Sequence, residues 1–144
     1  KMKSARTYLA AYACIRQLSF GYLDMAWHTL TEPFDGSVEQ FERMACQKTA
    51  FFGPTAGACM STQFNHLFAG GYAAGYYGYK WAEVLDADAF AVFSSHGGIN
   101  AEIGKRFKDC ILSKGGTEHP ARLYAAFKGG EPTIDALLKR DGIK

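Results

Sequence analysis

The residues best suited to chemistry in this sequence lie together in the stretch HLFAGGYAAGYYGYKW, residues 66–81. Four tyrosines and four glycines share the ten positions from Gly70 to Tyr79. A phenol hydroxyl is a neutral hydrogen-bond donor at pH 7, because its pKa is about 10. Paired glycines give the backbone freedom to move, so this stretch suits a mobile wall that contacts a ligand.

If residues 71–82 are helical, the glycines and Ala82 form one stripe, and Tyr72, Tyr76 and Tyr79 form the neighbouring stripe. We interpret Gly70 and Gly71 as a hinge-like loop at the entrance of this helix. Plain packing is the competing interpretation and is favoured by pattern alone. The functional interpretation gains because the phenols cannot all face the core and because the glycine pair stands where a lid needs mobility. Tyr77 is the tyrosine expected against the core.

Other chemically capable residues give weaker signals. His66 lies in FNHLF, and a lone histidine among apolar neighbours is more often a hydrogen-bonded core residue than a catalytic one. The four cysteines form no CxxC pair and predict reduced thiols without a catalytic role. They are Cys14, Cys46, Cys59 and Cys110. The acidic residues Glu83, Asp86 and Asp88 are interpreted as solvated charges on a helix.

The elements that would position these residues are all helical. Apolar spacing, capping residues and the Gly and Pro stops predict six helices, at about 4–31, 37–52, 73–94, 100–113, 120–128 and 133–141. Residues 54–63 are small and polar and are predicted to form a loop. Because no window alternates with the period of a strand, the fold class is predicted to be all-α. Residues 1–144 are expected to form a single helical region, whose abrupt helical start indicates a piece of a larger protein.

Composition excludes several classes of function. The net charge is +2 and no run of Lys and Arg exceeds two residues, which argues against nucleic-acid binding and against an anionic membrane surface. No apolar run approaches the about 20 residues that a membrane span needs. We therefore expect a soluble protein located in the cytoplasm.

Three stretches resemble a known family. HLFAGGYAAGYYGYKWAEVLDADAF resembles the C-terminal signature of the thimet-oligopeptidase family, zinc metallopeptidases that hydrolyse short peptides. GKRFKDCILSKGG and FKGGEPTIDALLKRDGI resemble its last helices. The resemblance covers nearly the whole chain, most strongly residues 63–143. Among the members of the family, the sequence is most similar to the peptidyl-dipeptidases and oligopeptidase A.

The resemblance implies roles for particular residues. Tyr79 would be the donor to the oxyanion of the reaction, and His66 would contact the substrate backbone as a second catalytic residue. Tyr72, Tyr76, Gly70 and Gly71 would bind substrate or let this wall close over it. The family's zinc-binding HExxH motif is absent, because the four histidines of this chain form no HxxxH pair. Zinc would therefore be a cofactor of the parent enzyme, with its ligands outside this chain.

The leading hypothesis is thus the substrate-cleft half of a zinc peptidyl-dipeptidase or oligopeptidase. Its partners would be short peptide substrates and the remainder of the parent polypeptide. This chain alone is predicted to hold no metal and to be inactive. The alternatives are a metal-free helical module that binds peptides without catalysis, and a purely structural helical fragment.

Overall fold

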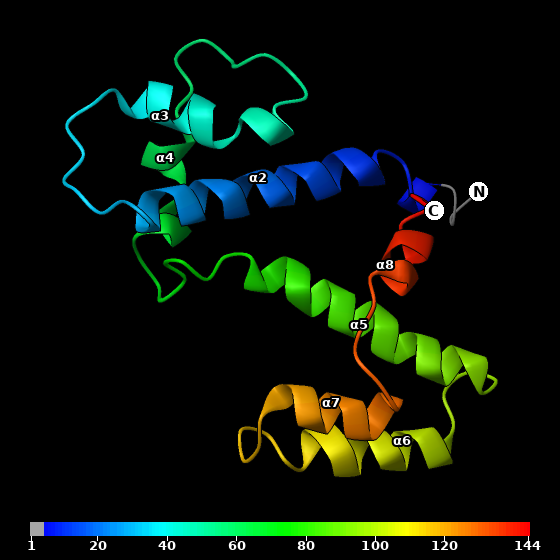
Figure 1. Cartoon of the computed structure of the whole chain (residues 1–144). Coiled ribbons are helices and arrows are strands. Elements are labelled where there is room, and N and C mark those ends of the chain that lie inside the picture. The colour runs from blue at the N-terminus through cyan, green and yellow to red at the C-terminus, as the bar shows by residue number, and fades with distance from the viewer. Residues whose placement is uncertain (1–4) are drawn as a thin grey trace. The chain divides into compact units, whose positions relative to one another are not determined.

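The computed structural model describes residues 5–144 and contains helices without any strand in that range (Figure 1). The predicted all-α class is confirmed. The chain divides into two compact units, Lys1–Lys80 and Trp81–Lys144. The expectation of a single helical region stays a prediction. No helix in the described range is long and apolar enough to cross a membrane.

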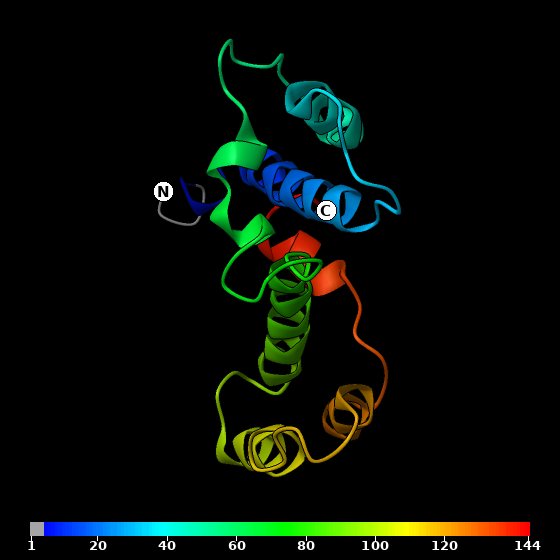
Figure 2. The same cartoon turned by 90° about the vertical axis from the view of Figure 1, so that its left-hand side faces the viewer.

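The first unit is built on one long helix. Its helices are α2 (Ala10–His28), α3 (Val38–Ala45) and α4 (Met60–Gln63), with 3₁₀ turns at Gln47–Thr49 and Asn65–Leu67. Helix α3 packs beside α2, and α4 packs against α3 (Figures 1 and 2). Helix α2 is shorter than the expected 4–31, because Leu9 has a left-handed backbone with φ 54°. Residue 4 lies outside the described residues.

Helix α3 begins where the sequence predicts and ends early. The Ser37 hydroxyl accepts the backbone N–H of Gln40 at 3.3 Å, as expected of an N-cap. The expected helix to residue 52 stops at Ala45. Phe51 and Phe52, which the predicted helix 37–52 would include, are 71% and 67% exposed. Without burial of these rings, little stabilises further helical turns.

The expected loop at 54–63 contains helix α4, and the cause is a distant carboxylate. Glu42 accepts the backbone N–H groups of Met60 at 3.0 Å and Ser61 at 2.7 Å. It thus satisfies donors that a helix N-terminus leaves free. Burial by itself raises the pKa of Glu42, but these hydrogen bonds outweigh burial and hold the pKa below its usual value.

The second unit contains the remaining helices. They are α5 (Gly78–Ser95), whose first turn belongs to the first unit, α6 (Ala101–Phe107) with a π-helical continuation at Lys108–Leu112, α7 (Pro120–Lys128) and α8 (Asp135–Arg140). Asn100 caps α6 by accepting the N–H of Ile103 at 3.0 Å. Helix α7 has the range expected from sequence, and α8 is shorter than the expected 133–141. Val84 and Ala87 of α5 pack with Leu137 of α8.

Helix α5 begins five residues later than the expected 73–94. Gly70 and Gly71 have φ of 76° and 77°, and Ala74 has φ 56°. A non-glycine residue in this left-handed region is strained by about 1–2 kcal/mol. The chain therefore passes through turns until Gly78, and the tyrosine segment is mostly a structured loop rather than a helix.

Asp88 is buried, which corrects the expectation of a solvated charge. Its carboxylate accepts the Tyr124 hydroxyl at 2.6 Å and the Thr133 hydroxyl at 3.3 Å, and the Lys128 ammonium lies 2.7 Å away. Burial alone raises the pKa of Asp88, but the Lys128 and Tyr124 contacts outweigh it and leave the pKa lowered. The carboxylate thus joins α5 to α7 and to the segment before α8.

A group with a lowered folded-state pKa stabilises the fold above its unfolded pKa and loses that contribution as pH falls through the folded pKa. For Asp88 the loss therefore begins below about pH 4. We expect Asp88→Asn to lower the free energy of unfolding by about 1–3 kcal/mol at pH 7 and by clearly less at pH 3. Urea denaturation at both pH values measures this. Asp109→Asn, at an exposed ion pair with Lys105, is the control, and equal losses at both pH values contradict the assignment.

Candidate functional site

The first unit brings the histidine and three of the tyrosines singled out in the sequence into one cluster. The ring of His66 lies 4.8 Å from that of Tyr72, 5.6 Å from Tyr76 and 6.1 Å from Tyr79, measured between centroids. Tyr72 and Tyr79 stack with centroids 5.3 Å apart and an interplanar angle of 18°. Gly70 lies next to this cluster, because a Cβ there would contact the Tyr72 ring at 3.6 Å.

The rings of this cluster differ in exposure. Tyr72 is 39% exposed and Tyr79 is 41% exposed, so both are partly accessible to solvent. Tyr76 is half-buried, its ring packs against Phe20 and Phe64, and its hydroxyl donates to the Gln17 side chain at 3.3 Å. Tyr76 therefore anchors the cluster to α2, whereas Tyr72 and Tyr79 can meet a ligand.

The chemistry available at Tyr79 is hydrogen-bond donation. Its hydrogen bond with Tyr72 and, to a smaller extent, its partial desolvation raise the pKa of the Tyr79 hydroxyl. A phenol whose pKa lies above its usual value of about 10 is fully protonated at neutral pH. Tyr79 can therefore offer a neutral donor but no base.

Tyr77 does not take the core position expected from sequence. Its ring is 59% exposed and belongs to no ring contact of the cluster in the described residues. Because the segment turns instead of continuing as a helix, its side chains do not follow the helical stripes assumed for them.

His66 is positioned by the short elements that Glu42 fixes. It lies in the 3₁₀ turn Asn65–Leu67, directly after α4, and the neighbouring Leu67 is fully buried. Ser61 of α4 donates its hydroxyl to Glu42 at 2.9 Å and accepts the Trp27 indole N–H at 3.0 Å. A carboxylate and an indole from two other helices thus hold the segment that presents His66.

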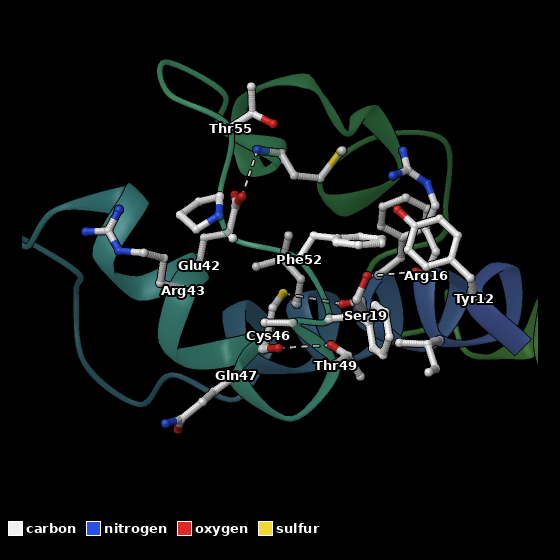
Figure 3. A pocket seen from close by; sticks show the side chains of 18 residues that line it. Tyr12, Arg16, Ser19, Glu42, Arg43, Cys46, Gln47, Thr49, Phe52 and Thr55 are labelled. Carbon is white, nitrogen blue, oxygen red and sulfur yellow. Dashed lines mark hydrogen bonds between the residues drawn. The ribbon is translucent and has the colours of Figure 1, made fainter.

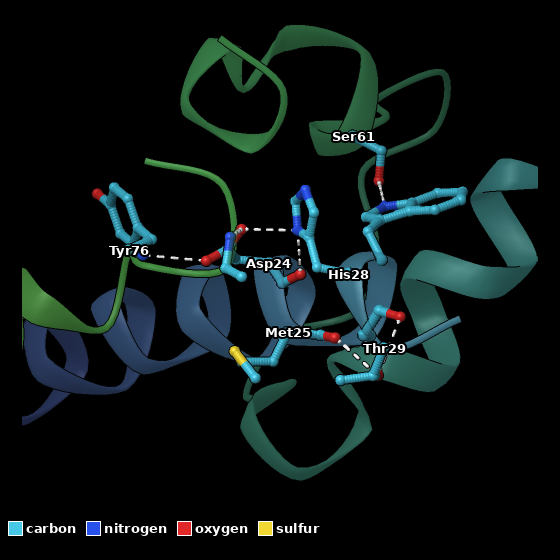
Figure 4. A network of polar contacts seen from close by, with 9 residues as sticks. Asp24, Met25, His28, Thr29, Ser61 and Tyr76 are labelled. Atoms are coloured by element: carbon cyan, nitrogen blue, oxygen red, sulfur yellow. Dashed lines mark hydrogen bonds and ion pairs between the residues drawn. The ribbon is translucent and has the colours of Figure 1, made fainter. Parts of the chain in front are cut away.

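Asp24 is the residue of this site that sequence reasoning missed. It is fully buried in α2, and its two carboxylate oxygens accept the backbone N–H groups of Ala74 and Tyr76, each at 3.0 Å (Figure 4). A signal was present, because Asp24 is the only acidic residue among positions 1–30 and stands between apolar neighbours. A charge in that setting predicts a buried carboxylate with specific partners.

A separate pocket of about 460 Å³ in the first unit does not include the cluster. Its lining includes Tyr12 and Arg16 of α2, Glu42 and Cys46 near α3, and Phe52 (Figure 3). Burial, with a contribution from Glu42, raises the pKa of the Cys46 thiol to about 11. A thiol with that pKa is a poor nucleophile at neutral pH.

A second pocket of about 740 Å³ lies in the second unit, between α5 and α7, and includes Trp81, Leu85 and Tyr124. It contains none of the predicted site residues. Within the described residues, no group of three or more His, Cys, Asp or Glu side chains is placed to hold a metal ion. The four cysteines are free.

Comparison with known proteins identifies the class. The chain matches Peptidase family M3 over residues 1–143 and belongs to that family. It is 44% identical to oligopeptidase A of Salmonella typhimurium over 100% of this chain and 21% of that protein. It is 37% identical to dipeptidyl carboxypeptidase of Escherichia coli over 99% of this chain and 21% of that protein. Saccharolysin of Saccharomyces cerevisiae is 32% identical over 90% of this chain and 18% of that protein. The chain thus spans about a fifth of the length of these relatives.

Proposed function

We propose that this chain is the C-terminal portion of a zinc-dependent peptidyl-dipeptidase or oligopeptidase and forms one wall of its substrate cleft. The observation that carries the proposal is the cluster in which His66 lies against Tyr72, and Tyr72 stacks on Tyr79 with both phenols partly exposed. Membership of a peptidase family supports it, as do relatives named oligopeptidase A and dipeptidyl carboxypeptidase.

Each residue then has a role in hydrolysis of short peptides. Tyr79 donates its hydroxyl proton in a hydrogen bond to the negative charge that develops on the carbonyl oxygen, which lowers the barrier. Tyr72 shares that role or contacts the substrate, and His66 hydrogen-bonds the substrate backbone. Tyr76 lines the wall and connects it to α2. Gly70 and Gly71, with left-handed backbones, let the wall approach the peptide.

The zinc of the parent enzyme would be held by residues outside this chain. When bound, zinc supplies Lewis-acid chemistry at the scissile carbonyl. The residues of this chain would supply neutral hydrogen-bond donors and orient the peptide. The free cysteines fit a reducing compartment, and a cytoplasmic location is part of the proposal.

We expect the 144-residue chain on its own to bind less than about a tenth of an equivalent of zinc and to cleave no peptide. The reason is that a catalytic zinc site needs three protein ligands held together. Metal analysis after dialysis and an assay with short quenched peptides measure both properties. The full-length parent protein is the positive control. One tightly held zinc per chain, or hydrolysis that a chelator stops, contradicts the proposal that the zinc ligands lie outside this chain.

The same assay distinguishes a peptidase from a peptide-binding module. The proposal requires the full-length protein to hydrolyse short peptides and to lose this activity with a chelator. A metal-free module binds the same peptides, measured by calorimetry, without releasing products.

A further inference from the structure

Asp24 is a fully buried carboxylate whose partners come from two places in the chain. Its Oδ1 atom accepts the N–H of Ala74 at 3.0 Å, and its Oδ2 atom accepts the N–H of Tyr76 at 3.0 Å. The two partners lie 50 and 52 residues further along the sequence. Figure 4 shows the carboxylate reaching from α2 to this segment. The carboxylate therefore joins a rigid helix to a loop that has no helical hydrogen bonds of its own at these amides.

His28 completes the environment of this carboxylate. Its Nδ1 atom lies 3.0 Å from Asp24 Oδ1 and 2.7 Å from the Asp24 backbone oxygen. Both neighbours are acceptors, so Nδ1 carries a proton and donates it. His28 lies one helical turn after Asp24 and thus orients the carboxylate. The two oxygens of Asp24 accept from three N–H groups in total.

The segment that Asp24 contacts has a strained backbone that needs contacts from outside the segment. Ala74 has a left-handed backbone although it is not a glycine, and Gly70 and Gly71 precede it with left-handed backbones. Strained residues of this kind persist only where the surrounding structure determines them. The two anchored amides stand between Tyr72 and Tyr79 in the chain. Their position therefore sets the geometry of the stacked phenols.

We propose that Asp24 is a positioning residue for the tyrosine wall: its carboxylate holds the Tyr72–Tyr79 segment so that both phenols are aligned before substrate binds. Asp24 does not touch the substrate, since it is buried within the first unit. The catalytic part of this inference depends on the function proposed for Tyr79, whereas the structural part does not. A carboxylate is required because both oxygens must accept an amide proton, and asparagine has one such oxygen.

The decisive variant is Asp24→Asn in the full-length enzyme, with Asp86→Asn as control. Asp86 is an exposed carboxylate paired with Arg140, and we expect its replacement to leave the kinetics of the wild type unchanged. Asn at position 24 has nearly the same size but turns an NH₂ group toward one backbone N–H, so one anchor is lost. We expect kcat to fall on the order of 10–10²-fold, because misplacing donors by about 1 Å has effects of that size. KM should change less than about threefold.

A double variant separates positioning from a general loss of structure. If Asp24 acts through Tyr79, Asp24→Asn in the Tyr79→Phe background lowers kcat by much less than it does in the wild type. If the reductions in kcat caused by the two substitutions multiply in the double variant, the inference is overturned. Kinetic values are normalised to the folded fraction measured by circular dichroism.

Hydrogen exchange tests the anchor without any activity. In the wild-type enzyme, the amides of Ala74 and Tyr76 should exchange slowly within peptides that span residues 72–79. Asp24→Asn should speed their exchange, and Asp86→Asn should leave it unchanged. Rapid exchange of both amides in the wild type overturns the inference, and this measurement stands even if Asp24→Asn does not fold. It also stands if the kinetics of Tyr79→Phe show that the phenol has no catalytic role.

Discussion

Tyr79→Phe in the full-length enzyme is expected to lower kcat on the order of 10²–10³-fold, which corresponds to about 3–4 kcal/mol of transition-state stabilisation. The substitution keeps the ring and its stacking on Tyr72, whose centroid is 5.3 Å away, and removes only the hydroxyl. The charge on the carbonyl oxygen exists only in the transition state, so KM should change much less than kcat. Steady-state kinetics with a short peptide substrate measure both constants.

Tyr77→Phe is the matched control for this experiment. Tyr77 lies two residues earlier in the same segment, carries the same side chain and is 59% exposed outside the ring cluster. Its loss of a hydroxyl should change kcat by less than about twofold, as is usual for an exposed position. If Tyr79→Phe and Tyr77→Phe both match the wild type, the tyrosine segment serves packing and the proposed role of Tyr79 is wrong.

The helices were predictable from sequence where local signals and burial agree. Pro120 and Gly129 delimit α7, and its side chains Leu123 and Phe127 are buried. Prediction was less accurate where tertiary contacts decide. The segment around Met60 becomes helical because Glu42, 18 residues away, caps it. The sequence of residues 54–63 does not indicate this partner.

The resemblance pointed to His66 and the tyrosines as residues of one site. It did not point to the contacts that hold the tyrosine segment in place. The expected helix from residue 73 assumed that backbone amides pair within the segment. Instead the amides of Ala74 and Tyr76 pair with Asp24 on another helix, so the segment turns. The spacing of apolar residues indicates backbone hydrogen bonds within one element. It does not indicate when a distant side chain accepts the same backbone N–H groups.

The largest loss of stability is expected for Phe127→Ala in the second unit. Phe127 is 1% exposed, and its ring lies 5.0 Å from Phe107 and 6.2 Å from Phe93, which come from α6 and α5. The Arg106 guanidinium lies over the same ring, 5.5 Å from its centroid. Truncation to alanine removes contacts with two other helices and leaves a cavity, which typically costs about 3–5 kcal/mol.

Such a loss is a large part of the about 5–15 kcal/mol by which most domains are stable, so Phe127→Ala should unfold this unit at low urea concentrations. Urea denaturation followed by circular dichroism measures the shift. Phe90→Ala is the matched control, because Phe90 belongs to the adjacent α5 and is 56% exposed; its effect should stay within about 0.5 kcal/mol. Phe127→Leu should lie between the two, since leucine fills part of the space. Equal midpoints for Phe127→Ala and Phe90→Ala mean that the ring does not hold these helices together, and the packing described for α5, α6 and α7 is then wrong.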